Sequence, residues 1–189
     1  MKITLDSSLD LKLNPIQPED QPTLYRLMDE VYRASYRYIW DDGGDWYVEL
    51  IYKTETVLKE LSRQTTHYFF VELGGDKVGI LKYDFPFSPK EIDLPNAMKI
   101  HRFYLHPKVH GKGIAQLLMA HCEKVARENQ LESIWLEVME CQPQAKRFYE
   151  KCGFGKVFFY VLDFEHIFRE YRGIEIWKKD IIHDFNPKK

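Results

Sequence analysis

The segment IHRFYLHPKVHGKGIA, residues 100–115, joins a strand pattern to the start of a helix. The strand is expected over 98–105. Gly111 and Gly113 follow it, and their spacing lets the backbone pass close to a ligand. At its N-terminus, the helix expected over 113–127 would point unpaired N–H groups and the positive end of its dipole outward. The segment therefore predicts a cradle for a pyrophosphate.

Two other kinds of phosphate site can be tested on spacing. A dinucleotide fingerprint needs a third glycine three residues after Gly113, where Gln116 stands. A P-loop needs Ser or Thr after Gly-Lys, but Gly113 follows Lys112. Both alternatives fail. A glycine pair before a helix is also a way for a loop to turn, so a purely structural role stays open for this segment alone.

A second informative segment is QPQAKRFYEKCGF, residues 142–154. Pro143 suits a first helical turn and Gly153 suits the left-handed residue after the last one, which predicts a helix over 143–151. Ala145 and Tyr149 share one face of that helix. A ligand could lie against the small residue, with the phenol hydroxyl at its end. The alternative is a core tyrosine with a satisfied hydroxyl.

Together the two segments resemble the GNAT superfamily of acetyl-CoA-dependent N-acetyltransferases. The family's first motif is Arg or Gln, two residues, Gly, one residue, Gly or Ala, and 110–115 matches it with His110 in the first place. The second is Asn-x-x-Ala-x-x-x-Tyr followed by Gly-Phe. Its matches here are Gln142, which replaces Asn, and Ala145, Tyr149, Gly153 and Phe154. The resemblance is closest over residues 98–160.

This resemblance implies an α/β (α+β) fold, with a mixed, strongly twisted sheet flanked by helices. The strands 98–105 and 133–139 would splay apart, and the pantetheine arm of acetyl-CoA would enter the gap. No metal is implied. The residues implied in cofactor binding are Phe103, Tyr104 and Leu105 along the arm, His110, Gly111, Lys112, Gly113, Ile114 and Ala115 around the pyrophosphate, and Gln142.

The implied reaction is direct attack of an amine on the thioester, with Tyr149 in the family position of the general acid. A second group must take a proton from the amine, because alkylamines are mostly protonated near neutral pH. Glu137 and His101 are candidates, and the His101 side chain titrates in the useful range. Each also has an ordinary explanation: Glu137 as a partner of Arg102 or another cation, and His101 as a satisfied strand residue.

The amine acceptor is expected to bind near an aromatic and acidic loop over residues 36–46. Such a loop suits a cation through charge pairing and cation–π contact, and the alternative is a solvated acidic turn. Replacing its first two acids with Asn is then expected to raise the KM for the amine. The residues concerned are Tyr36, Tyr38, Trp40, Asp41, Asp42, Asp45 and Trp46.

The remaining pattern predicts a mixed α and β chain organised as a single domain, 1–189. Helices are expected over 19–33 and 47–62, the second burying Leu50, Ile51, Val57 and Leu61. A hairpin is expected from strands 67–73 and 77–83 around a Gly-Gly-Asp turn. The last strands are expected over 157–163 and 174–179.

Composition limits the class of protein further. The chain has 27 basic and 29 acidic residues, a net charge of −2, and 44% hydrophobic residues. This balance gives no reason to expect binding to nucleic acid or to a membrane surface. The odd set Cys122, Cys141 and Cys152, interpreted as small buried side chains, fits a reducing compartment. A cytoplasmic location is expected, and a homodimer stays open.

The function these features favour is transfer of an acetyl group from acetyl-CoA to a primary amine of a small molecule or peptide. Three alternatives remain. The first is transfer of a longer acyl group, and the second is a non-catalytic acyl-CoA-binding sensor, suggested by His110 and Gln142 in place of the usual residues. The third is an interaction module that uses an exposed strand over 174–177.

Overall fold

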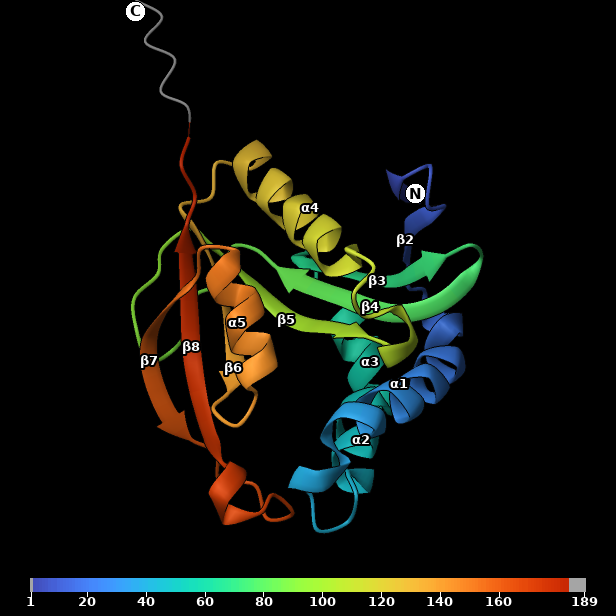
Figure 1. Ribbon diagram of the computed structural model, residues 1–189, viewed down its shortest axis with the longest axis vertical. Helices are drawn as coiled ribbons and strands as arrows, with labels where there is room; N and C mark the ends of the chain where they lie inside the picture. The colour runs from blue at the N-terminus through green and yellow to red at the C-terminus, as the bar shows by residue number, and fades with distance from the viewer. Residues whose placement is uncertain (1, 184–189) are drawn as a thin grey trace, which may run out of the picture.

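The computed structural model describes residues 2–183; Met1 and residues 184–189, the ends of the predicted unit 1–189, lie outside the described residues. One sheet of eight strands runs in the order β1-β2-β3-β4-β5-β6-β8-β7 (Figure 1). The strands are β1 (Ile3–Asp6), β2 (Leu11–Pro15), β3 (Thr66–Leu73), β4 (Asp76–Asp84), β5 (Ala97–Leu105), β6 (Ser133–Met139), β7 (Gly155–Val161) and β8 (Gly173–Asp180). The mixed α/β fold expected from the sequence is confirmed.

Helices cover both faces of this sheet (Figure 1). The α-helices are α1 (Gln21–Tyr36), α2 (Asp45–Tyr52), α3 (Thr54–Leu61), α4 (Ile114–Glu128) and α5 (Pro143–Lys151). Short 3-10 segments are η1 (Pro18–Asp20), η2 (Arg37–Ile39), η3 (Pro107–Val109) and η4 (Arg169–Tyr171). Within residues 2–183, no helix combines the length and the apolar character that crossing a membrane requires.

Strand β3 shows how the two faces divide the core. Phe69 and Val71 belong to a cluster with α4 and α5, whereas Tyr68 and Phe70 belong to a cluster with α1, α2 and α3. Alternate strand residues point to opposite faces, so a continuous apolar run fits a strand buried on both sides. The expected hairpin is confirmed, because β3 pairs antiparallel with β4.

The parallel pairing between β5 and β6 is short. It runs from Ala97 opposite Ser133 to Ile100 opposite Leu136, although β5 continues to Leu105. On its other side, β5 stays paired with β4 as far as Leu105. The two strands therefore splay after Ile100, as the family resemblance implies. Backbone groups at the end of β5 are left facing the gap.

The sequence interpretation missed the first hairpin, β1 with β2. Leu11 and Leu13 of β2 are fully buried, and β2 pairs with β3 along its whole length. Four to five residues of alternating pattern give a weak signal, because periodicity is judged over longer windows. The hairpin extends the sheet at the β3 edge.

The single helix expected over 47–62 is wrong. Lys53 has an extended backbone, with φ −64° and ψ 157°, and separates α2 from α3. The change of direction turns Leu50 outward, where it is 37% exposed, while Val57 is buried as expected. Leu61 is half-buried.

The exposed strand expected over 174–177 is also wrong. It lies within β8, between β6 and β7, and all four of its residues are buried. The exposed edges of the sheet are β1 and β7. An interaction module built on residues 174–177 is therefore excluded, because its backbone groups already bond to two neighbouring strands.

Candidate active site

The turn before α4 has an open, left-handed backbone. Gly111 has φ +75° and Gly113 has φ +77°, and a Cβ atom added to either would meet nothing within 4 Å. Gly113 is the N-cap of α4 and has no side chain that could bond to the first turn. The Gln116 N–H already donates to the Gly113 carbonyl. The first N–H groups, those of Ile114 and Ala115, have no intrahelical acceptor. The turn can therefore receive an anion.

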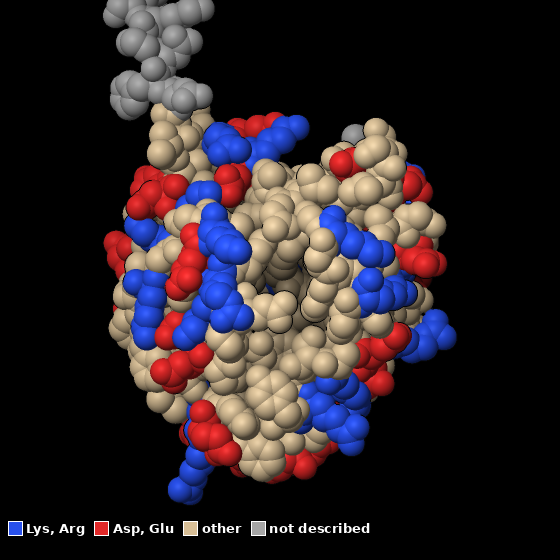
Figure 2. Space-filling model, viewed as in Figure 1, with Lys and Arg blue, Asp and Glu red and all other residues tan. Residues whose placement is uncertain are grey.

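A cavity of about 670 Å³ extends from this turn between β5, α1 and α5. Figure 2 shows a hollow at the centre of this face, with Lys and Arg side chains on both sides of it. The structure brings together at this cavity Tyr149 and every residue that the resemblance implies in cofactor binding except Lys112, which is exposed outside it. Those residues are Phe103, Tyr104, Leu105, His110, Gly111, Gly113, Ile114, Ala115, Gln142 and Tyr149.

Two of these side chains are already hydrogen-bonded. The His110 ring nitrogen Nε2 lies 3.1 Å from the carbonyl oxygen of Leu105. Gln142 Nε2 donates to the Tyr38 hydroxyl at 3.0 Å, which ties the start of α5 to η2. The positions where the sequence departs from the family motifs therefore make contacts within the protein.

Tyr149 lies on the buried face of α5. Its ring contacts those of Phe103, Phe148 and Phe154, at centroid distances of 6.5, 5.3 and 5.9 Å. Burial raises the pKa of Tyr149 well above its usual range, so the phenol keeps its proton throughout the physiological pH range. Pro143 in the first turn and Gly153 with φ +86° bound α5 as the sequence predicts.

A smaller cavity of about 340 Å³ adjoins the first, in the gap between β5 and β6. Its wall includes Glu137 and His101 and side chains from α1, α2 and β7. The residues common to both cavities are Tyr36, Phe103, Tyr104, Ala145 and Tyr149. Tyr149 therefore stands where the two cavities meet, with the small Ala145 one turn before it.

The two candidate bases differ in environment. Glu137 accepts a hydrogen bond from Lys99 at 2.9 Å, so its partner is Lys99 rather than Arg102. His101 lies 3.2 Å from the buried carboxylate of Asp84. Burial lowers the pKa of His101 to about 4. The expectation that His101 titrates in the useful range is therefore wrong, and its imidazole is neutral at pH 7.

The acids of the loop over 36–46 have partners outside both cavities. Asp41 contacts His166 at 3.0 Å. Asp42 accepts from the backbone N–H groups at the start of α2, including that of Trp46 at 2.6 Å. Asp45 pairs with Arg33. The aromatic members Tyr36 and Trp40 line the smaller cavity, but none of the three acids does.

A network of buried charges lies behind β5, and the sequence analysis did not find it. The Arg102 guanidinium forms two bonds with Glu60 of α3, at 2.6 and 2.8 Å. Lys82 lies 3.5 Å from Glu60 and 3.9 Å from Asp84. Burial lowers the pKa of Lys82 to about 8. The available signal was the position of Lys82 and Arg102 inside two strand patterns that are rich in apolar residues.

The three cysteines are free, although the odd count required only that they could not all pair. Cys122 is buried, whereas Cys141 and Cys152 are only half-buried. Burial raises the pKa of Cys122 well above its usual range, so this thiol is unreactive. His121 bonds to the Tyr83 hydroxyl at 3.3 Å and does not serve as a base for the neighbouring thiol.

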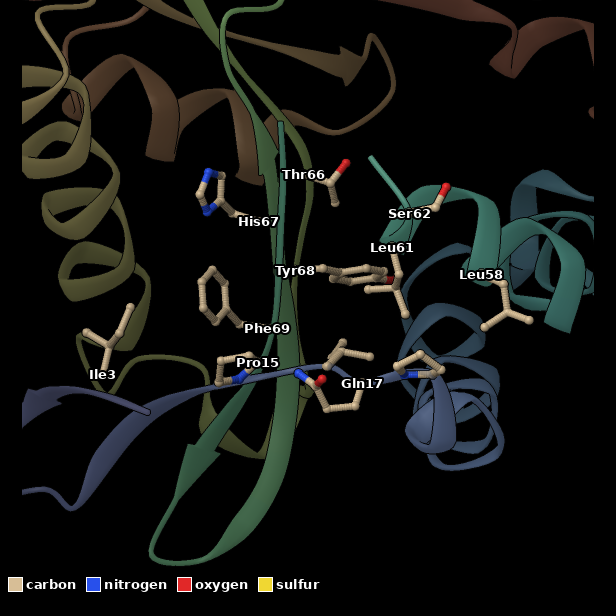
Figure 3. Close-up of a pocket in the computed structure, with 12 residues that line it drawn as sticks. Ile3, Pro15, Gln17, Leu58, Leu61, Ser62, Thr66, His67, Tyr68 and Phe69 are labelled. Atoms are coloured by element: carbon tan, nitrogen blue, oxygen red, sulfur yellow. The ribbon is translucent and has the colours of Figure 1, made fainter. Parts of the chain in front are cut away.

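A hollow of about 550 Å³ lies away from these cavities, around β2 and β3. Figure 3 shows His67 and Phe69 on one side of β3, and Thr66 and Tyr68 on the other. The lining is thus divided between two faces of the sheet, and it includes no site residue expected from the sequence. Among residues 2–183, no group of three His, Cys, Asp or Glu side chains is placed to hold a metal ion.

The comparison with protein families identifies the class. A model described as the acetyltransferase (GNAT) family matches residues 25–154. This chain belongs to the GNAT acetyltransferase family. It is also 30% identical over 94 residues to an uncharacterized N-acetyltransferase in the pepI 3' region of Lactobacillus delbrueckii subsp. lactis. That match spans 50% of this chain and 54% of the relative.

Solved structures share the fold at low sequence identity. The PaiA N-acetyltransferase of Thermoplasma acidophilum, in complex with coenzyme A, has a TM-score of 0.67 and 19% identity, covering 90% of this chain and 98% of that one. The spermidine N-acetyltransferase of Vibrio cholerae, in complex with CoA and spermine, has a TM-score of 0.66 and 20% identity, covering 93% and 97%. The ribosomal-protein-S18-alanine N-acetyltransferase of Escherichia coli reaches 0.65 and 13%, covering 93% and 97%.

Proposed function

We propose that this protein transfers an acetyl group from acetyl-CoA to a primary amine by direct attack, with Tyr149 as the general acid. The observation that carries the proposal is the position of Tyr149 between two adjoining cavities. The larger cavity would receive the cosubstrate and the smaller one the amine. The small Ala145 leaves room for the reacting groups beside the phenol.

The residues around the larger cavity fit coenzyme A. The open turn at Gly111 and Gly113 offers backbone N–H groups to a pyrophosphate, without a Cβ atom in the way. Phe103, Tyr104 and Leu105 lie at the end of β5, beyond the last pairing with β6, where backbone groups can bond to the amides of the pantetheine arm. His110, Lys112, Ile114, Ala115 and Gln142 complete the proposed set.

Acetyl-CoA, when bound, supplies the activated carbonyl carbon, and its sulfur departs as a thiol. The amine nitrogen forms the new bond to that carbon as the carbon–sulfur bond breaks. Tyr149 donates its phenolic proton to the departing sulfur, and its raised pKa keeps that proton available at neutral pH.

The amine must lose two protons when it starts as an ammonium. One replaces the proton that Tyr149 gives to the sulfur, and the other leaves to solvent. Glu137 is the carboxylate in the wall of the smaller cavity, and we assign it the role of proton acceptor. His101 is a weaker choice, because its more buried imidazole already contacts the Asp84 carboxylate, whereas the more exposed Glu137 side chain can pass a proton on to solvent.

Release of free thiol from acetyl-CoA, measured with a chromogenic thiol reagent and a panel of primary amines, tests the function. Tyr149→Phe is expected to lower kcat by about 100-fold, because it removes one positioned proton donor. The KM for acetyl-CoA should stay unchanged. Tyr25→Phe is the matched control, since the Tyr25 hydroxyl bonds to Glu49 outside both cavities. Equal kcat values for the two variants would overturn the role of Tyr149.

A non-catalytic acyl-CoA sensor is the second candidate. It is favoured by one observation, that the side chains of His110 and Gln142 are already bonded to Leu105 and Tyr38. A sensor would bind acetyl-CoA in calorimetry but release no thiol with any amine. Thiol release with acetyl-CoA but faster release with a longer acyl-CoA would instead favour the larger acyl group.

We propose a single catalytic domain and a cytoplasmic location for this chain. The location is supported by the three unpaired cysteines, because a reducing compartment keeps thiols free. The near-neutral charge supports a small amine or a peptide end as the acceptor rather than nucleic acid. Fractionation of cells that express the tagged chain tests the location directly.

A further inference from the structure

Aromatic rings make up nearly half of the residues that line the smaller cavity. Nine of its lining residues are aromatic: Tyr32, Tyr36, Trp40, Tyr47, Phe103, Tyr104, Tyr149, Tyr160 and Phe164. They come from α1, the loop between η2 and α2, α2, β5, α5, β7 and the loop after β7. The volume of about 340 Å³ lies at the lower end of the range for small-molecule sites. The cavity thus suits a compact ligand that can pack against aromatic rings.

The rings are packed against one another and form a rigid wall. The Tyr32 ring stacks on Tyr36 at 4.8 Å and on Tyr47 at 4.5 Å, and meets Tyr104 edge-on at 5.9 Å. The Trp40 indole N–H donates to the Tyr32 hydroxyl at 3.1 Å. Such a wall is fixed before the ligand arrives, so little ordering opposes binding.

The same cavity carries very little charge. Glu137 is the one carboxylate among its lining residues, and it accepts a hydrogen bond from Lys99. Neither Lys nor Arg lines it. A ligand with several ammonium groups would bury its further charges among the rings without carboxylate partners, which is unfavourable in an apolar setting. The lining therefore selects against polyamines.

A cavity wall with few charged groups also serves the reaction. Removal of an amine from water favours its uncharged form, and only the uncharged form can attack a carbonyl. A single carboxylate is sufficient to take the proton that the amine releases. The composition of the cavity thus matches a ligand with one amino group.

Resting on the proposed function, we propose that the acceptor is a primary monoamine that carries an aromatic ring on a short linker. The ring lies among the side chains that line only the smaller cavity, Trp40, Tyr47, Tyr160 and Phe164. Aromatic rings attract one another in edge-on and offset arrangements beyond the area they bury. The amino group then extends toward Tyr149, where the two cavities meet.

Phe164 is the best position for a test. It is half-buried and lies outside the regular strands, between β7 and η4, so its truncation leaves the sheet intact. Phe168 is a matched control four residues further on, because it is 41% exposed and lines neither cavity.

The experiment compares kcat/KM for 2-phenylethylamine, 2-cyclohexylethylamine and spermidine at saturating acetyl-CoA. We expect kcat/KM for 2-phenylethylamine to exceed that for spermidine by at least about tenfold, since buried charges without partners discriminate strongly between substrates. The kcat/KM for 2-phenylethylamine should also exceed that for 2-cyclohexylethylamine, which has a similar shape but no aromatic π-system. Phe164→Ala should lower the value for 2-phenylethylamine by about tenfold, with the KM for acetyl-CoA unchanged. Phe168→Ala should leave both unchanged.

Three results overturn the acceptor class while leaving acetyl transfer in place. They are a preference for spermidine, a preference for the cyclohexyl compound, and an equal loss in the Phe164→Ala and Phe168→Ala variants. Thiol release by other amines with none from 2-phenylethylamine has the same meaning. A failure of acetyl-CoA to bind in calorimetry contradicts the proposed function itself, so the two failures are distinguishable.

Discussion

The Nε2 atom of His110 lies 3.1 Å from the carbonyl oxygen of Leu105, so the residue at the head of the phosphate-binding motif bonds to the end of β5. A carbonyl only accepts, and this ring nitrogen must therefore carry the hydrogen. The contact fixes the turn relative to the strand. In the proposed complex, His110 acts mainly on the shape of the turn and the backbone holds the pyrophosphate.

The backbone nature of the proposed cradle predicts a difference between two variants. Gly113→Ala places a side chain at φ +77°, which costs about 1–2 kcal/mol for an L-residue and should raise the KM for acetyl-CoA by about tenfold. His110→Ala removes a single side-chain bond and should change that KM by less than about threefold. Initial rates at varied acetyl-CoA measure both, and the reverse order would contradict a backbone cradle.

Gly79 of β4 lies against the strand proposed to bind the pantetheine arm. A Cβ atom added there would come within 2.2 Å of the Tyr104 backbone oxygen, so β5 would have to move. Gly79→Ala is expected to destabilise the protein by about 1–3 kcal/mol, as overpacking does. Gly155→Ala is the control, because its added Cβ meets nothing within 4 Å and its φ is not left-handed. Similar melting temperatures for the two variants would show that β5 can shift freely.

The bond between Glu60 and Arg102 predicts a large loss of stability on truncation. Arg102 is 7% exposed, and Lys82 lies in the same network. Glu60→Ala leaves two buried cations without this carboxylate and should cost about 3–5 kcal/mol of unfolding free energy. Glu128→Ala, which removes an exposed partner of Lys124, should cost less than about 1 kcal/mol. Urea denaturation of both variants provides the measurement.

The lowered pKa of His101 predicts acid sensitivity. Its folded pKa is about 4 and its ordinary value is 6.5, so between these values the unfolded chain binds more protons. Stability is therefore lost as the pH falls from about 6.5 toward 4. Burial also lowers the pKa of His67 and His121, with the same sign.

The measurement compares wild type with His101→Gln by urea denaturation at pH 7 and pH 5. His101 should account for about 2 kcal/mol of the wild-type loss, and the variant should lose that much less. At pH 5 the carboxylates of Glu60 and Asp84, whose pKa values are lowered, stay ionised and do not contribute. An equal loss in both proteins would mean that His101 keeps an ordinary pKa when folded.

Local patterns explain which parts of the fold could be predicted. The helix over 143–151 carries its own start and stop residues, Pro143 and Gly153, and its bounds agree with α5. The break at Lys53 has no such residue, and the amphipathic pattern continues through it. Gln21 of α1 donates to the Tyr52 carbonyl and accepts from Thr54, and these contacts between distant residues hold the chain at the break. The short β1 and β2 strands depend on pairing with β3, a long-range contact that no local pattern reveals.

In the candidate site too, the residues that belong to local motifs could be predicted, and the residues brought together from distant segments could not. The expected cofactor residues gather at one cavity because each belongs to a motif whose spacing sets its geometry. The smaller cavity could be predicted only in part. Trp40 and Tyr36 were found in an aromatic loop, but Phe164 and Tyr160 reach the cavity from residues 160–164, more than a hundred positions away. The sequence leaves open whether the loop acids bind a ligand, because charge alone does not show that Asp41 and Asp45 already have partners within the protein.

The early end of pairing between β5 and β6 divides the sheet into a part of five strands and a part of three strands, whose pairing runs along residues 97–100 and 133–136. An extended molecule that bonds to the free edge of β5 would connect the two parts of the sheet across the gap. Binding in the gap would then restrict movement between the two parts of the sheet. The amide hydrogens near Ile100 and Leu136 would exchange with solvent more slowly in the complex than in the free protein.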